Sequence, residues 1–119
     1  MVGGGNIDGP SAGLAFFLAL YSALKQEPLP QDVAVTGEVS LAGNVRGVGG
    51  IVEKLYAARQ AGMRAILVPR ENVREIDATP EGIELIPVGT VAEALAAVGV
   101  RVPAPPVLRA RRTTTKVPR

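Results

Sequence analysis

The 119-residue sequence contains no histidine, no cysteine and no tryptophan. Without histidine or cysteine, the chain cannot form a Ser-His-Asp triad, a thiolate nucleophile, a zinc finger or a disulfide framework. A general base working near neutral pH must therefore be a carboxylate, or a lysine with a lowered pKa. The lack of cysteine fits a reducing compartment, so we expect a cytoplasmic protein. We expect neither a metal ion nor another cofactor on this chain.

Long apolar runs are also missing. No segment reaches the roughly 18 apolar residues that a membrane helix needs, and no basic segment precedes the longest run, residues 13–24, as it would in a signal peptide. We therefore expect no membrane contact.

Charge is divided unevenly along the chain. Eight of the 13 basic residues and all 11 acidic residues precede Arg109, so the first 108 residues carry −3 and the last eleven carry +5. Residues 102–106 are proline-rich, and a basic, threonine-rich run follows them, which predicts a disordered tail over 101–119. Its basic residues suit phosphate contacts, but no aromatic residue interleaves them to stack bases. We favour a solubilising extension and expect no nucleic-acid partner.

Residues 1–100 are predicted to form one folded unit of alternating helices and strands. Apolar periodicity and turn residues predict helices over 10–25, 51–61 and 90–98, and strands over 32–41, 45–48, 64–69 and 84–88. This order is typical of the α/β or α+β class. The first helix is apolar nearly all round, which predicts burial at the centre of the fold. These few short strands would form only a small sheet to cover three helices. We therefore expect a piece of a larger domain, or a chain whose core is completed by a partner.

The first candidate site is the loop-to-helix turn at residues 8–13, Asp-Gly-Pro-Ser-Ala-Gly. It places the Ser11 hydroxyl in the first turn of a helix, where unpaired backbone N–H groups favour developing negative charge, as an oxyanion hole requires. The alternative is that Ser11 or Asp8 only caps the helix. A phosphate-binding loop fits poorly, because Pro10 stands where that motif needs its lysine.

The second candidate is Lys54. At about 100° per residue, the apolar face of helix 51–61 contains Ile51, Leu55, Ala58 and Ala61, and Lys54 falls inside this arc. Burial of an ammonium group lowers its pKa, so such a lysine can act as a base. The alternative is a side chain that extends along the edge of the apolar face towards solvent.

Ser11 and Lys54 together are the components of a Ser-Lys dyad. Thr36, on the strand between them, is placed to orient the lysine amine. The polar residues Glu71, Arg74, Glu75 and Asp77 are predicted to form a solvated face without chemistry.

Three segments also resemble motifs of the Lon-type serine proteases. Residues 8–13 are similar to the nucleophile motif, residues 32–43 (Asp-Val-Ala-Val-Thr-Gly-Glu-Val-Ser-Leu-Ala-Gly) to the strand before the lysine, and residues 48–54 (Val-Gly-Gly-Ile-Val-Glu-Lys) to the lysine motif. The spacing of 43 residues from Ser11 to Lys54 agrees with the pattern. The resemblance covers roughly residues 3–99, and the glycine-rich start resembles the shorter bacterial Lon relatives of sporulating lineages.

The resemblance implies a role for each candidate residue. Ser11 would be the nucleophile and Lys54 the general base, with Thr36 supporting the lysine. Asp8 would shape the loop, and the backbone N–H groups of Ser11 and Gly9 would form the oxyanion hole. The reaction would be hydrolysis of peptide bonds through an acyl-enzyme.

The resemblance also implies a fold and partners. Residues 1–100 would be the C-terminal part of a Lon proteolytic domain, an α/β fold of the ribosomal protein S5 domain 2-like type, present here in part. Substrates would be polypeptides, the assembly a hexameric ring, and ATP would be held only by an ATPase module outside this chain. Gly47 stands where the family commonly has proline, which predicts a looser turn before Lys54. The alternative is a catalytically silent assembly domain like the DNA-repair relatives that share this fold, although those typically lack the serine and lysine that this chain retains.

Overall fold

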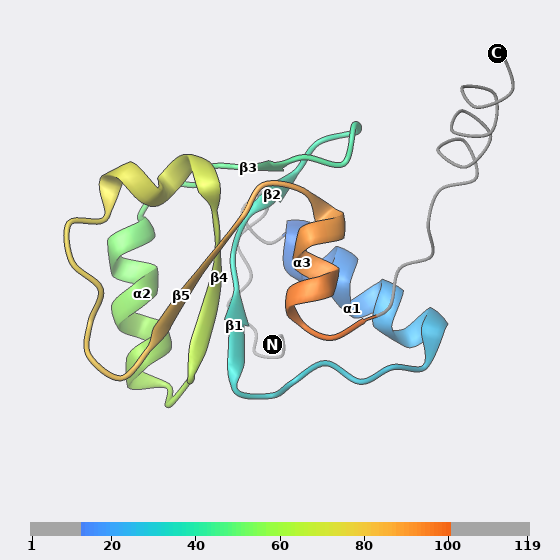
Figure 1. Ribbon diagram of the computed structural model, residues 1–119, viewed down its shortest axis with the longest axis horizontal. Coiled ribbons are helices and arrows are strands. Elements are labelled where there is room, and N and C mark those ends of the chain that lie inside the picture. The colour runs from blue at the N-terminus through green and yellow to red at the C-terminus, as the bar shows by residue number, and fades with distance from the viewer. Residues whose placement is uncertain (1–12, 101–119) are drawn as a thin grey trace, which may run out of the picture.

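The computed structural model describes residues 13–100 (Figure 1). Its elements, in chain order, are α1 (Gly13–Lys25), β1 (Val33–Val35), β2 (Glu38–Val39), β3 (Val45–Arg46), α2 (Ile51–Gln60), β4 (Ala65–Pro69), the 3-10 helix η3 (Arg70–Glu75), β5 (Glu84–Val88) and α3 (Val91–Ala97). The predicted α/β class is confirmed. The predicted tail, residues 101–119, lies outside the described residues.

A parallel sheet with the strand order β1-β4-β5 forms the centre of the molecule. Val33 is paired with Ala65 of β4, and Ala65 is paired in turn with Glu84 of β5. Parallel neighbours need crossover connections, and α2 lies within the connection from β1 to β4. Figure 1 shows α2 on one face of the sheet and α1 and α3 on the other.

The central strand β4 supplies side chains to both faces of this sheet. All five of its residues are buried. Because side chains alternate along a strand, Leu67 joins the cluster beneath α1 and α3, while Ile66 and Val68 join the cluster beneath α2. The core is therefore divided into two layers by a sheet that is apolar on both faces.

The predicted burial of the first helix on all sides is wrong. Leu14 and Leu18 are fully buried, on the side of the helix that faces the sheet. Phe16, Leu20 and Leu24, in contrast, are 55%, 62% and 75% exposed. These three residues are four apart and so lie on one face of α1. Within residues 13–100 only the opposite face of the helix is covered, because α3 and β2 pack on that side.

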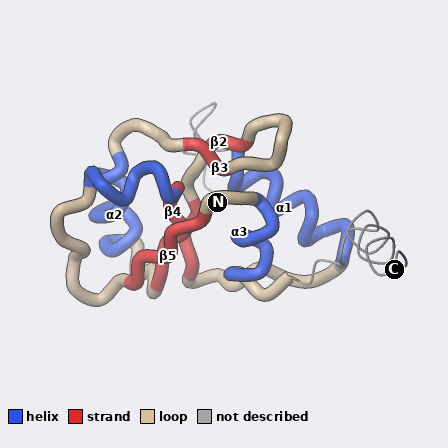
Figure 2. The backbone as a smooth tube through the Cα atoms, turned by 45° about the horizontal axis from the view of Figure 1, so that its top comes forward, coloured by secondary structure: helices blue, strands red, loops and turns tan. Residues whose placement is uncertain are grey.

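The predicted single strand over 32–41 is also wrong, because the chain bends at Thr36 and Gly37. The Thr36 N–H still donates to the Leu67 carbonyl at 3.1 Å, which continues the pairing of β1 with β4. Gly37 then adopts φ +151°, a conformation that favours glycine. The chain leaves the sheet there, and β2 pairs with β3 in a separate antiparallel hairpin. Figure 2 shows this hairpin across one end of the molecule's main sheet.

The predicted helix ends are confirmed where a local signal marks them. Gly62 and Gly99 follow α2 and α3 with φ values of +82° and +85°, as glycines after a helix do. The Thr90 hydroxyl caps α3 by accepting the Glu93 N–H at 3.1 Å. The Glu93 carboxylate accepts the Gly89 N–H at 2.7 Å.

Exposed ion pairs join segments that are distant in sequence. They include Arg46–Glu71 and Arg64–Asp32, both at 2.9 Å, and Arg70–Glu93 at 3.2 Å. The hydrogen bond from Arg64 holds the pKa of Asp32 below its ordinary value. The N–H groups of Gly47 and Gly89, assisted by the arginines, lower the pKa of Glu71 and Glu93 in the same way.

These lowered pKa values predict that acid destabilises the fold. Between the ordinary values, 3.8 for Asp32 and 4.5 for the two glutamates, and the lower folded values, the folded chain binds fewer protons than the unfolded chain. The stabilisation that these three carboxylates contribute is therefore complete at pH values above their ordinary pKa. It is lost as the pH falls through their lower pKa values in the folded chain. We expect the urea midpoint, followed by circular dichroism, to drop between about pH 6 and pH 3. Glu93→Gln should flatten this dependence, and a midpoint that stays level in the unsubstituted chain would contradict the expectation.

Candidate active site

The carboxyl ends of all three parallel strands meet at one edge of the sheet. Thr36 follows β1, η3 follows β4 directly, and Gly89 follows β5. The β2–β3 hairpin lies at this edge, where the Val45 N–H donates to the Gly89 carbonyl at 2.9 Å. In open α/β sheets, sites form outside the carboxyl ends of the strands. This edge is therefore where candidate functional residues are best placed to converge.

Thr36 occupies an unusual position at this edge. The residue is only 6% exposed, and its Oγ1 has no hydrogen-bond partner among the described residues. A buried hydroxyl without a partner costs free energy that an ordinary core residue would not. Such an atom is a candidate for contact with a catalytic group.

The beginning of α1 lies beside the bend that contains Thr36. The Leu14 N–H donates to the Gly37 carbonyl at 2.9 Å, and a Cβ placed on Gly13 would lie 3.4 Å from the Val39 nitrogen. The small residue at position 13 thus lets the helix start approach the backbone of the bend closely.

Asp8, Gly9 and Ser11 lie outside the described residues. Their predicted roles stay predictions, and in the sequence Ser11 stands two positions before Gly13, the first residue that the structure describes.

Lys54 lies in α2 at the margin of its apolar face. Ile51, Leu55 and Ala58 are buried, whereas Ala61, which was assigned to the same face, is exposed. Lys54 is accordingly half-buried rather than directed fully into the core. Its N–H donates to the Gly50 carbonyl at 3.1 Å, so the loop before α2 helps to hold the backbone of the lysine.

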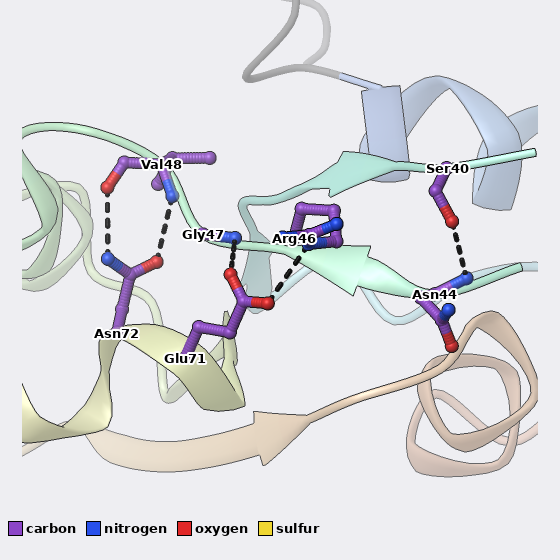
Figure 3. A network of polar contacts seen from close by, with 7 residues as sticks. All are labelled: Ser40, Asn44, Arg46, Gly47, Val48, Glu71 and Asn72. Carbon is purple, nitrogen blue, oxygen red and sulfur yellow. Dashed lines mark hydrogen bonds and ion pairs between the residues drawn. The ribbon is translucent and has the colours of Figure 1, made fainter.

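Two side chains of η3 hold this loop (Figure 3). Asn72 uses both ends of its amide on Val48: Oδ1 accepts the Val48 N–H and Nδ2 donates to the Val48 carbonyl, each at 2.9 Å. Glu71 accepts the Gly47 N–H at 2.8 Å and the Arg46 Nε–H at 2.9 Å. The side chain of Glu71 therefore holds the turn at Gly47, which the sequence predicted to be looser. It does so through the Gly47 N–H, a group that proline lacks.

Sequence reasoning missed this contact. Glu71 was assigned to a solvated face, and Asn72 was not singled out, although it is only 2% exposed. The available signal was their position in the sequence. Both residues follow shortly after a fully buried strand, at the carboxyl edge of the sheet, where sites form.

The described residues show no metal site and no membrane span. Between residues 13 and 100 no group of three or more acidic side chains could hold a metal ion. Over the same residues, none of the helices has both the length and the hydropathy to cross a bilayer.

The sequence has clear relatives. Residues 2–100 match the family described as the Lon protease (S16) C-terminal proteolytic domain. Lon protease from Brucella suis biovar 1 is 40% identical over 115 residues, covering 93% of this chain and 14% of that protein. Lon protease from Haemophilus influenzae is 48% identical over 77 residues, which cover 65% of this chain and 10% of that protein. Lon protease 2 from Bacillus subtilis is 44% identical over 93 residues, which cover 78% of this chain and 17% of that protein.

The chain thus spans only a small part of the length of these relatives, and the match falls on the segment that carries all three predicted motifs. The chain belongs to the Lon protease C-terminal proteolytic domain family.

Proposed function

We propose that this chain supplies the catalytic pair of a serine peptidase, with Ser11 as the nucleophile and Lys54 as the general base. The observation that carries the proposal is the match of residues 2–100 to a proteolytic domain. That span includes Ser11, Thr36 and Lys54, and the sequence offers no histidine or cysteine for a different acyl-transfer mechanism.

The proposed reaction proceeds through an acyl-enzyme. The neutral Lys54 amine removes the proton from the Ser11 hydroxyl as Oγ attacks the peptide carbonyl. The N–H groups of Ser11 and Gly9 stabilise the oxyanion. The Lys54 ammonium then protonates the departing amine, and the regenerated amine activates the water that hydrolyses the ester. Asp8 shapes the loop that carries the serine.

The buried hydroxyl of Thr36 supports a role for this residue beside the lysine. Its Oγ1 has no hydrogen-bond partner within residues 13–100, and the start of α1 lies against the same bend. A hydroxyl in this position can accept a hydrogen bond from an amine and so fix its direction.

We also propose the context of this activity. Residues 1–100 act as part of the proteolytic domain, and residues 101–119 as an extension. The substrates are polypeptides, the assembly is a hexameric ring in the cytoplasm, and an ATPase module outside this chain binds ATP. The exposed apolar residues of α1, Phe16, Leu20 and Leu24, support a chain that works in contact with other polypeptide.

A serine-directed fluorophosphonate tests the proposed nucleophile. We expect the folded chain to be labelled once, on the peptide that contains Ser11, because only an activated hydroxyl reacts quickly with such a probe. Mass spectrometry of the digested protein identifies the site.

The other two serines provide matched controls. Ser22→Ala and Ser40→Ala should keep the label, whereas Ser11→Ala should lose it. If the chain is folded by circular dichroism and Ser11 reacts no faster than Ser22 or Ser40, the proposed nucleophile is wrong and the catalytically silent assembly domain is favoured.

A further inference from the structure

We infer that Asn72, assisted by its neighbour Glu71, is a positioning residue for Lys54: it fixes the loop from which the lysine helix begins. The inference rests on the proposed function for its catalytic meaning. Neither residue is assigned a role in the reaction itself, since each acts through the loop formed by residues 46–48.

Asn72 holds the backbone of Val48. Both backbone polar groups of Val48 are bound by one side-chain amide, each at 2.9 Å, and both residues are buried. The bonds connect residues 24 apart in the sequence. The pairing resembles one rung of a strand ladder, and it fixes the orientation of both peptide groups that flank the Val48 Cα as well as their place.

The loop that contains Val48 leads directly into the helix that carries Lys54. Gly50 is the N-cap of α2, with φ 66° and ψ 34°, and no side chain caps the helix there. The carbonyl of Gly50 accepts the Lys54 N–H at 3.1 Å. With no capping side chain, the orientation of the first turn depends on the path of the loop that Asn72 holds.

Asparagine suits position 72 because of its amide group. Only an amide offers a donor and an acceptor side by side at this length. Its Nδ2 also donates to Glu75 Oε2 at 3.2 Å. An aspartate would keep the shape but would lose the donor and place its carboxylate against the Val48 carbonyl and the Glu75 carboxylate.

Glu71 supports the same loop from its exposed side. Its two oxygens bind the Gly47 N–H and Arg46, and its side chain is 51% exposed. A Cβ on Gly47 would lie 3.2 Å from Glu71 Oε1, so the glycine leaves room for this contact.

The experiment compares Asn72→Asp with Thr90→Ala in the full chain. The second variant removes the cap of α3 and so destabilises the fold at a point outside the loop. Fluorophosphonate labelling at Ser11 is resolved into the binding constant KI and the chemical rate kinact. For Asn72→Asp we expect kinact to fall about tenfold or more, because small displacements of a catalytic group have large effects on rate, while KI changes little. For Thr90→Ala we expect both constants to stay near those of the unsubstituted chain.

Amide hydrogen exchange gives a readout that does not depend on activity. We expect the Lys54 amide to exchange faster in Asn72→Asp than in Thr90→Ala, because the loop that supplies its acceptor is released. Glu71→Ala, at an exposed position, should show the same two changes to a smaller extent. It keeps the test decisive if Asn72→Asp does not fold.

The outcomes separate the inference from the proposed function. If the unsubstituted chain is not labelled at Ser11, the proposed function fails, and the exchange data alone decide whether Asn72 holds the Lys54 backbone. If it is labelled but Asn72→Asp and Glu71→Ala match Thr90→Ala in kinact and in exchange, Asn72 is no positioning residue and the inference is overturned.

Discussion

Replacing Lys54 with methionine is expected to lower the rate at which a fluorophosphonate phosphonylates Ser11, with loss of fluoride, by about 10²–10⁴-fold, which is the usual contribution of a positioned general base. The fold should persist. Lys54 is half-buried at the margin of the apolar face of α2, and methionine keeps the apolar stem of the side chain without the amine. Circular dichroism checks the fold, and the labelling rate at Ser11 measures the effect.

Lys54→Arg separates basicity from charge. Arginine supplies a long cationic side chain at this position but stays protonated at neutral pH and so cannot accept the proton; we expect it to be as slow as Lys54→Met. Lys25→Met, at the exposed C-terminal end of α1, is the matched control and should react like the unsubstituted chain. Labelling of Lys54→Arg at the normal rate would show that the lysine is not the base.

Gly37→Ala is expected to reduce the free energy of unfolding by about 2–4 kcal/mol, the combined effect of backbone strain and overpacking. Gly37 has φ +151°, and an added Cβ would lie 2.9 Å from Val45 Cγ1 and 3.4 Å from Leu14 Cδ2. Both neighbours are buried, so neither can move away easily. Urea unfolding followed by circular dichroism measures the change.

Gly43→Ala isolates the strain. Gly43 has φ +87°, with nothing within 4 Å of an added Cβ, so its substitution should cost only about 1–2 kcal/mol. Crowding is tested by a double-mutant cycle: Gly37→Ala should cost less in a Val45→Ala background, where Cγ1 is gone. Equal costs in the two backgrounds would refute the crowding at Gly37.

The sequence predicted the elements that carry strong local signals. The strands at 64–69 and 84–88 and the helices at 51–61 and 90–98 agree with β4, β5, α2 and α3 to within one or two residues. Gly62, Gly99 and Thr90 mark helix ends by their own conformations or hydrogen bonds, which depend little on the rest of the fold.

The misses depend on contacts between distant segments. Residues 32–41 are rich in strand-forming residues, yet the chain bends at Gly37, which has φ +151° and lies close to the side chains of Leu14 and Val45. The apolar composition of α1 could not tell which face the rest of the chain would cover. Asn72 belongs to no periodic pattern, and its importance comes from Val48, a residue brought to it only by folding.

The candidate site was predictable to a lesser extent. The motifs around Ser11, Thr36 and Lys54 identify the family, whereas the buried, unpartnered hydroxyl of Thr36 within residues 13–100 is a property of packing. The half-burial of Lys54 likewise depends on the width of the apolar face, which ends before Ala61.

The order of the strands in the sheet determines how this chain can fold during synthesis. β1 pairs with β4, which follows only after the hairpin and α2, and β4 pairs on its other side with β5. As the polypeptide leaves the ribosome, β1 has to wait for β4 to emerge before this pairing can form. Such non-local pairing folds slowly. The segments made before β4, among them the apolar helix α1, therefore stay exposed to chaperones and degradation until β4 has emerged.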